Sequence, residues 1–182
     1  MNIRENVPIS SLTTMRLGGP ARYLIEVENC DELAEAYNFA KDNQLPVYVL
    51  GGGSNIIGRD AGFNGVVIHS KLRGMGVVSE DPLLPEADDT YLYAYSGEEL
   101  DDFVRYACKL GLSGLESLSA IPGSVGAAPV QNVGAYGGEV SQSLVYLEAF
   151  DSQELKMKTF WADELNFGYR RSIFNQGELV VR

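Results

Sequence analysis

The stretch YVLGGGSNIIG, residues 48–58, decides the fold, because three glycines and a Ser-Asn pair directly follow an apolar run. The apolar run PVYVL (46–50) has the composition of a short buried strand, and GVVIH (65–69) has that of another. Glycine lacks a Cβ, so its backbone N–H groups stay accessible and its φ can be positive. The stretch therefore predicts a strand, a glycine-lined loop and a second strand.

Two common phosphate-binding loops do not fit this segment. A G-x-G-x-x-G loop opens a helix, but Ile56 stands three positions after Gly53. Only IIGRDAGFN separates the glycines from the next strand, whereas a helical crossover needs about a dozen residues. A P-loop is excluded because no Lys-Ser or Lys-Thr follows the glycines. Two interpretations remain: a nest of bare N–H groups that grips a pyrophosphate, or a tight turn with positive φ.

A second glycine-rich stretch, LESLSAIPGSVGAAPVQNVGAYGGEV (115–140), has few bulky side chains over much of its length. Small residues let the backbone approach a flat ligand closely, while Ser124, Gln131 and Asn132 offer directional polar groups. The alternative is a packed connection of small residues beneath a sheet. Two such loops in one chain favour a binding site.

Composition limits the function. Of the 182 residues 45% are hydrophobic, and the net charge is −11. This charge argues against nucleic acid or a membrane surface as the partner, and requires local dipoles and particular arginines for any anionic ligand. No apolar stretch approaches the roughly 18 residues of a membrane span, and the N-terminus has no apolar signal region, so we expect a cytoplasmic protein. A single histidine, His69, and two distant cysteines, Cys30 and Cys108, predict no metal site and no disulfide framework; we expect both thiols to be buried.

The rest of the chain alternates strand-like and helix-like patterns. Strands are predicted over 21–28, 90–96, 143–150 and the final ELVVR. A helix is predicted over DELAEAYNFAKDN (31–43), with Asp31 as its cap. A second helix is predicted to follow Ser96, with a capping box of Ser96 and Glu99.

Four motifs together resemble one enzyme family. TTMRLGGPARYLIEV, LGGGSNI, IPGSVGAAPVQNVGAYGGE and FGYRRSIF occur in the order and spacing of the UDP-N-acetylenolpyruvoylglucosamine reductases (UDP-N-acetylmuramate dehydrogenases), which serve bacterial peptidoglycan synthesis and hence cell shape and division. The resemblance runs from about Thr13 to the end of the chain.

The resemblance implies an α+β, PCMH-type (vanillyl-alcohol-oxidase-like) FAD-binding fold of two subdomains, residues 1–70 and 71–182. In that family the first glycine loop holds the FAD pyrophosphate, which here assigns Gly51, Gly52, Gly53, Ser54 and Asn55. The second loop lines the rest of the cofactor and the isoalloxazine, which assigns Ile121, Pro122, Gly123, Ser124, Gly126, Ala127, Gln131, Asn132, Gly134 and Ala135.

The implied reaction has two halves. NADPH reduces FAD, and the flavin then passes a hydride to the enolpyruvyl group of a UDP-sugar. Arg170 matches the family's arginine in the F-G-Y-R motif, where a fixed guanidinium stabilises the negative charge that builds on the substrate carboxylate. The resemblance also assigns Tyr169 to substrate binding.

The sequence departs from the family in two respects. Arg171 stands where the family usually carries an aspartate, and family members continue into a substrate-binding domain that supplies a catalytic serine and glutamate. No matching serine or glutamate motif occurs here. We therefore expect this chain to bind FAD but to catalyse the reaction poorly or not at all. The alternatives are a natural short flavin- or nucleotide-binding protein and another PCMH-type oxidase; the strand pattern that ends at Arg182 favours a piece of the reductase.

Overall fold

The computed structural model describes residues 1–84, 89–176 and 179–181. Its first sheet has four strands in the order β1 (Asn2–Pro8), β2 (Pro20–Val27), β4 (Phe63–Ser70) and β3 (Val47–Leu50). Strand β1 is antiparallel to β2, whereas β2 and β3 both run parallel to β4. Residues 51–62 connect β3 to β4 without a helix, which confirms that this is no Rossmann crossover.

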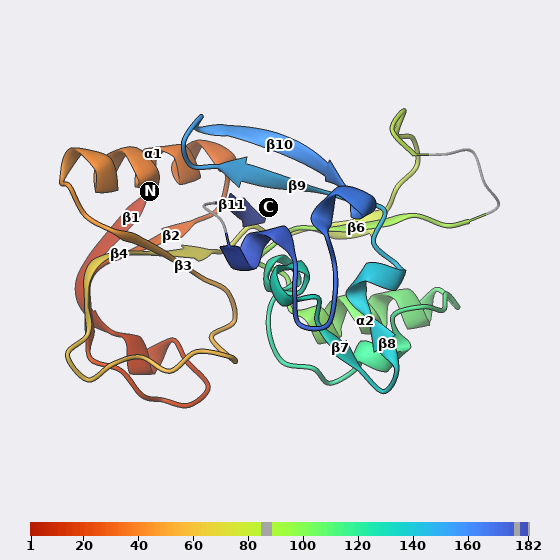
Figure 1. Ribbon diagram of the computed structural model, residues 1–182, viewed down its shortest axis with the longest axis horizontal. Helices are drawn as coiled ribbons and strands as arrows, with labels where there is room; N and C mark the ends of the chain where they lie inside the picture. Colours follow the sequence, from red (N-terminus) through yellow and green to blue (C-terminus); the bar gives the residue numbers. More distant parts are fainter. Residues whose placement is uncertain (85–88, 177–178, 182) are drawn as a thin grey trace.

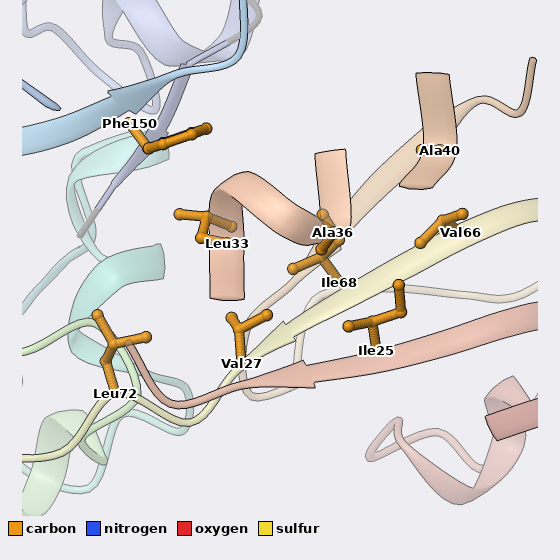
Figure 2. Packing of buried hydrophobic residues seen from close by; sticks show 9 residues of the cluster. All are labelled: Ile25, Val27, Leu33, Ala36, Ala40, Val66, Ile68, Leu72 and Phe150. Atoms are coloured by element: carbon orange, nitrogen blue, oxygen red, sulfur yellow. The ribbon is translucent and has the colours of Figure 1, made fainter. Parts of the chain in front are cut away.

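Helix α1 (Cys30–Asp42) covers one face of this sheet (Figure 1). Leu33, Ala36 and Ala40 form its buried side, as Figure 2 shows, and pack against strand residues such as Ile25 and Ile68. The predicted cap at Asp31 is wrong, because the Asn29 side chain accepts the hydrogen bond from the Glu32 N–H at 2.9 Å. Such a cap stabilises a helix by about 1 kcal/mol, and it starts α1 one residue before Asp31.

The second helix, α2 (Leu100–Lys109), follows a short hairpin of β5 (Met75–Val77) and β6 (Leu92–Ala94). The predicted capping box is wrong: Glu99 is the N-cap without a side-chain bond, and the Ser96 hydroxyl instead pairs with the Ser70 hydroxyl at 2.7 Å. A tertiary contact between two chain segments thus replaces the local cap.

A third sheet has the order β10 (Lys156–Trp161), β9 (Tyr146–Asp151), β11 (Leu179–Val181), with both neighbours antiparallel to β9. Phe150 on β9 is 2% exposed and belongs to the core beneath α1, so the two sheets share one apolar cluster (Figure 2). The predicted final strand is present over Leu179–Val181, and Arg182 lies outside the described residues.

Short elements complete the chain. Strands β7 (Gly134–Ala135) and β8 (Gly138–Glu139) form a small hairpin. The 3-10 turns are η1 (Ile9–Ser11), η2 (Glu116–Leu118), η3 (Val125–Ala127), η4 (Pro129–Gln131), η5 (Val140–Gln142), η6 (Ala162–Leu165) and η7 (Ile173–Gln176). No helix among the described residues combines the length and apolar composition that a membrane crossing requires.

The strands predicted over 21–28, 46–50 and 65–69 are present as β2, β3 and β4. The strand predicted over 90–96 is shorter, and the one over 143–150 begins later and ends at Asp151. The thiol prediction is wrong for Cys108, which is exposed; Cys30 is half-buried.

Candidate functional site

The first glycine loop, residues 51–55, begins where β3 ends at Leu50. Gly53 has φ +66° and its carbonyl accepts the Thr14 N–H at 3.1 Å. A Cβ added at Gly53 would lie 2.0 Å from the Leu12 carbonyl oxygen. The backbone of Leu12 and Thr13 therefore leaves no room for a side chain at this position.

The loop presents a row of free donors. In residues 1–84, 89–176 and 179–181, the N–H groups of Gly52, Gly53, Ser54 and Asn55 donate no hydrogen bond. Neighbouring N–H groups of this kind form a positive concavity that suits an anion, because each brings a partial charge and an unused donor. The loop can therefore bind phosphate oxygens without any lysine or arginine.

The second glycine-rich loop packs directly against the first. The Ser54 hydroxyl donates to the Pro122 carbonyl at 3.0 Å, and the Asn55 side-chain amide donates to Gln131 Oε1 at 3.2 Å. A Cβ on Gly52 would lie 2.9 Å from Gly123 Cα. The structure thus brings together the two motifs that the sequence assigns to one cofactor.

Gly51 also faces this second loop, since a Cβ there would lie 2.7 Å from Ser124 Oγ and 3.0 Å from the Ala127 methyl. The loop in turn rests on the segment before α2. The Gly126 N–H donates to the Ser96 carbonyl at 3.0 Å, and a Cβ on Gly126 would lie 2.4 Å from Ser96 Cβ. Contacts within the protein therefore require small residues at these positions.

The entrance to the second loop is held by an aspartate of α2. Asp101 Oδ1 accepts the Ala120 N–H at 2.6 Å and the Ser119 hydroxyl at 3.3 Å. The bond from Ala120 is the main cause that lowers the pKa of Asp101. Ala120 has φ +61°, and the next residue, Ile121, bonds back to Leu118 at 3.2 Å, so the start of the predicted flavin-lining stretch is fixed.

Asn132 occupies a different environment from the other predicted cofactor residues. It is 1% exposed, has φ +47°, and its side chain bonds Glu139, Gly168 and the Ser141 N–H. Its amide is therefore fully engaged by protein groups. Its backbone N–H also donates within the protein, to the Pro129 carbonyl at 3.3 Å.

Arg170 lies in a tight turn in which Gly168 and Arg171 exchange two backbone hydrogen bonds of 3.1 Å. Its guanidinium donates to the Gly134 carbonyl at 3.1 Å and stands over the Tyr169 ring, 5.7 Å from the centroid. The predicted catalytic arginine therefore contacts the predicted flavin-lining segment, beside Ala135 in β7. Tyr169 is 85% exposed.

Arg171 does not disturb this arrangement. It is exposed, and it forms no ion pair with any residue that the structure describes. The turn is held instead by Asn175, whose side-chain amide donates to the Arg170 carbonyl at 3.3 Å. The positive charge at position 171 thus leaves Arg170 bound to Gly134.

Sequence reasoning missed two features of this region. Tyr136 is 93% exposed at the tip of the β7–β8 hairpin and has φ +51°, a conformation that costs a bulky residue energy. The segment around Thr14 also belongs to the site, because its backbone braces Gly53. The motif TTMR contained that signal, whereas nothing in the pattern AYGGE reveals an exposed tyrosine.

A cavity of about 510 Å³ lies away from this site, between α1, β3 and the turn that joins β9 to β10. Its lining includes Tyr37, Lys41 and Tyr48, and it contains no residue that the sequence assigns to the cofactor. We call the two contacting glycine loops, residues 51–55 and 121–135, the cradle; the contacts between them, and not this cavity, define the candidate site.

Comparisons with known proteins agree with this geometry. The family model described as FAD binding domain matches residues 21–154. The UDP-N-acetylenolpyruvoylglucosamine reductase of Thermobifida fusca is 43% identical over 179 residues, which is 97% of this chain and 48% of that protein. The chain spans about half the length of the curated relatives it matches.

Two solved structures extend the comparison. The UDP-N-acetylenolpyruvylglucosamine reductase from Thermus caldophilus superposes with a TM-score of 0.76 at 32% identity, covering 99% of this chain and 60% of that one. Cholesterol oxidase from B. sterolicum, at 12% identity and a TM-score of 0.63, covers 88% of this chain and 32% of its own, and shares the fold alone. The similarity that the motifs indicated and the predicted α+β, PCMH-type fold are both confirmed.

Proposed function

Because the chain belongs to the FAD binding domain family, we propose that it is the FAD-binding part of a UDP-N-acetylenolpyruvoylglucosamine reductase. In this proposal residues 1–70 and 71–182 are the two subdomains that hold the cofactor between them. The complete enzyme uses NADPH as hydride donor, acts on a UDP-sugar in the cytoplasm and serves peptidoglycan synthesis.

One observation carries the proposal: residues 52–55, whose N–H groups donate no hydrogen bond among the described residues, follow β3 and contact the second glycine loop. A pyrophosphate carries several acceptor oxygens, so it fits a row of unused donors. The glycines at 51, 52 and 53 cannot carry side chains, because each Cβ would meet protein atoms within 3.0 Å. These clashes hold the loop in its observed course, and it is the row of unused N–H donors that fits the FAD pyrophosphate.

Bound FAD would carry the hydride from NADPH to the enolpyruvyl group. The chain's own contribution begins with binding, for which Gly52 to Asn55 donate N–H groups to the pyrophosphate. Around a bound flavin, the backbone from Ile121 to Ala127 and from Gln131 to Ala135 would limit the access of water and bulky groups. Small side chains there permit close approach.

Arg170 is the group proposed to act on the substrate. Its guanidinium is fixed by the Gly134 carbonyl, so no reorganisation is needed when negative charge develops on a nearby carboxylate. An arginine stays charged at every physiological pH and presents several donors in a plane. Tyr169 supports the same role, since its ring packs under the guanidinium.

The test is the visible absorption spectrum of the purified chain before and after addition of FAD, followed by desalting. Flavin bands that are perturbed from free FAD and retained on desalting support the proposal. A chain that leaves the FAD spectrum unchanged and releases all of it would overturn FAD binding. Bound FAD that NADPH does not reduce, in a protein that consumes O₂, would favour the oxidase alternative.

A further inference from the structure

Asn132 is a buried polar side chain whose three hydrogen bonds reach two separate segments, residues 139–141 and the turn that begins at Gly168. Its amide nitrogen donates to Glu139 Oε2 at 2.8 Å and to the Gly168 carbonyl at 3.2 Å. Its amide oxygen accepts the Ser141 N–H at 3.1 Å. A buried amide satisfied in this way has one orientation, because any rotation leaves donors or acceptors unpaired.

Gly168 begins the turn that carries Arg170. The guanidinium of that arginine returns to the Gly134 carbonyl, two residues after Asn132. The backbone of the turn and the charged group at its tip are therefore both bound to the same short segment, residues 132–134. Movement of this segment would move the arginine with it.

We propose that Asn132 is a positioning residue that fixes the Arg170 turn to the cofactor-lining loop through the Gly168 carbonyl. This inference rests on the proposed function, and assigns to Asn132 a role other than contact with FAD. Asparagine is suited to it because it tolerates φ +47° and carries an amide donor. At this position glycine would adopt the same backbone conformation but would offer no side-chain donor. Aspartate would place a second carboxylate against Glu139.

Three variants separate positioning from simple stabilisation. Asn132→Asp keeps the acceptor for Ser141 and loses both donors. In the double variant Asn132→Asp/Glu139→Gln the glutamine amide can donate to the aspartate, so a hydrogen bond between positions 132 and 139 is restored. The bond to the Gly168 carbonyl is not restored. Asn166→Asp is the matched control, because Asn166 has the same φ of +47°, is exposed, and forms no side-chain hydrogen bond with the described residues.

The first readout is native-state trypsin cleavage after Arg170 and Arg171, followed by mass spectrometry alongside the melting temperature. We expect Asn132→Asp to be cleaved roughly tenfold faster than wild type, because a lost buried hydrogen bond shifts local opening by about that factor. Asn166→Asp should stay within about twofold. In the double variant the melting temperature should recover while cleavage stays fast.

The second readout is the absorption spectrum of bound FAD. Arg170→Ala should shift the flavin bands, the double variant should show the same shift, and adding Arg170→Ala to it should change nothing more, since coupled residues are not additive. Wild-type cleavage in the double variant would mean that Asn132 acts only through Glu139, and would overturn the proposal. If wild type binds no FAD, the proposed function fails, while the cleavage rates still decide the role of Asn132.

Discussion

Ser54 and Pro122 stand sixty-eight positions apart in the sequence, and the hydroxyl of the first donates a 3.0 Å hydrogen bond to the carbonyl of the second. This bond joins the two glycine-rich loops. A carbonyl held in this way cannot turn towards the ligand, and the serine N–H stays available. The bond therefore organises the cradle without consuming its donors.

Ser54→Ala should weaken FAD binding by roughly three- to tenfold, because a single neutral hydrogen bond contributes about 0.5–1.5 kcal/mol. Fluorescence titration with FAD measures the effect. Ser10→Ala is a suitable control, since Ser10 lies in η1 and has no side-chain bond with the described residues. Equal affinity of the Ser54 variant and wild type would contradict the role of the bond.

Gly53→Ala should abolish FAD binding while the chain keeps much of its helical circular dichroism. The added Cβ would lie 2.0 Å from the Leu12 carbonyl oxygen, so the loop must move. Gly111→Ala separates this effect from backbone strain, because Gly111 has φ +76° with nothing within 4 Å of its Cβ position. That control should lose about 1 kcal/mol of stability and bind FAD normally.

Arg170→Ala, in a full-length reductase that carries this segment, should slow flavin reoxidation by the UDP-sugar about 10²- to 10³-fold. Flavin reduction by NADPH should change far less, because no carboxylate charge develops in that half-reaction. Stopped-flow absorbance resolves the two steps. Arg171→Ala, at the exposed neighbour, should affect neither, and equal slowing of both steps by Arg170→Ala would count against its assignment.

Phe150→Ala should cost about 3–5 kcal/mol of unfolding free energy, because it empties a buried aromatic site. The ring stacks on Tyr37 of α1, with centroids 5.5 Å apart, and links the third sheet to the first. Thr159→Ala on the exposed side of β10 should change stability by less than about 0.5 kcal/mol. Urea denaturation compares the two, and similar midpoints would mean that the sheets fold independently.

His69 should make the protein less stable in mild acid. Burial lowers the pKa of its imidazole to about 4 from 6.5, and the charge of Lys71 adds to this, while Glu26 opposes it. Between these two pH values the unfolded chain binds the proton and the folded chain does not, so the free energy of unfolding falls as pH decreases from 6.5 to about 4.

His69→Gln removes this dependence, so the stability difference between the variant and wild type should change across that pH range and level off outside it. Urea midpoints at several pH values measure this difference. Proton NMR follows the imidazole directly, because the sequence has one histidine. An imidazole that titrates near 6.5 in the folded protein would contradict the prediction.

The sequence was sufficient for the parts of the site that depend on backbone alone. GGGSN and its spacing predicted a helix-free connection between two strands, and residues 51–62 form one, because glycine content and spacing report directly on what the backbone can do. The motif order also predicted that residues 51–55 and 121–135 form one site, and the bonds of Ser54 and Asn55 join these loops.

Side-chain partners were harder to predict, because tertiary contacts decide them. Ser96 has the spacing of a helix cap, yet its hydroxyl forms a hydrogen bond with that of Ser70, at the end of β4. Asn29 rather than Asp31 caps α1, although both residue types suit the position. Asn132 offers an amide that composition assigns to a ligand, and only the fold reveals that Glu139 and Gly168 already occupy it.

The distance in sequence between the two glycine loops also sets the time at which the cradle can form. A ribosome adds about 5–20 residues per second, so Pro122 follows Ser54 by roughly 3–14 s. During that interval the first loop has no partner, and its contact with the second loop must form across a long chain segment, which is slow. A newly made chain should therefore acquire FAD only after the second loop has emerged.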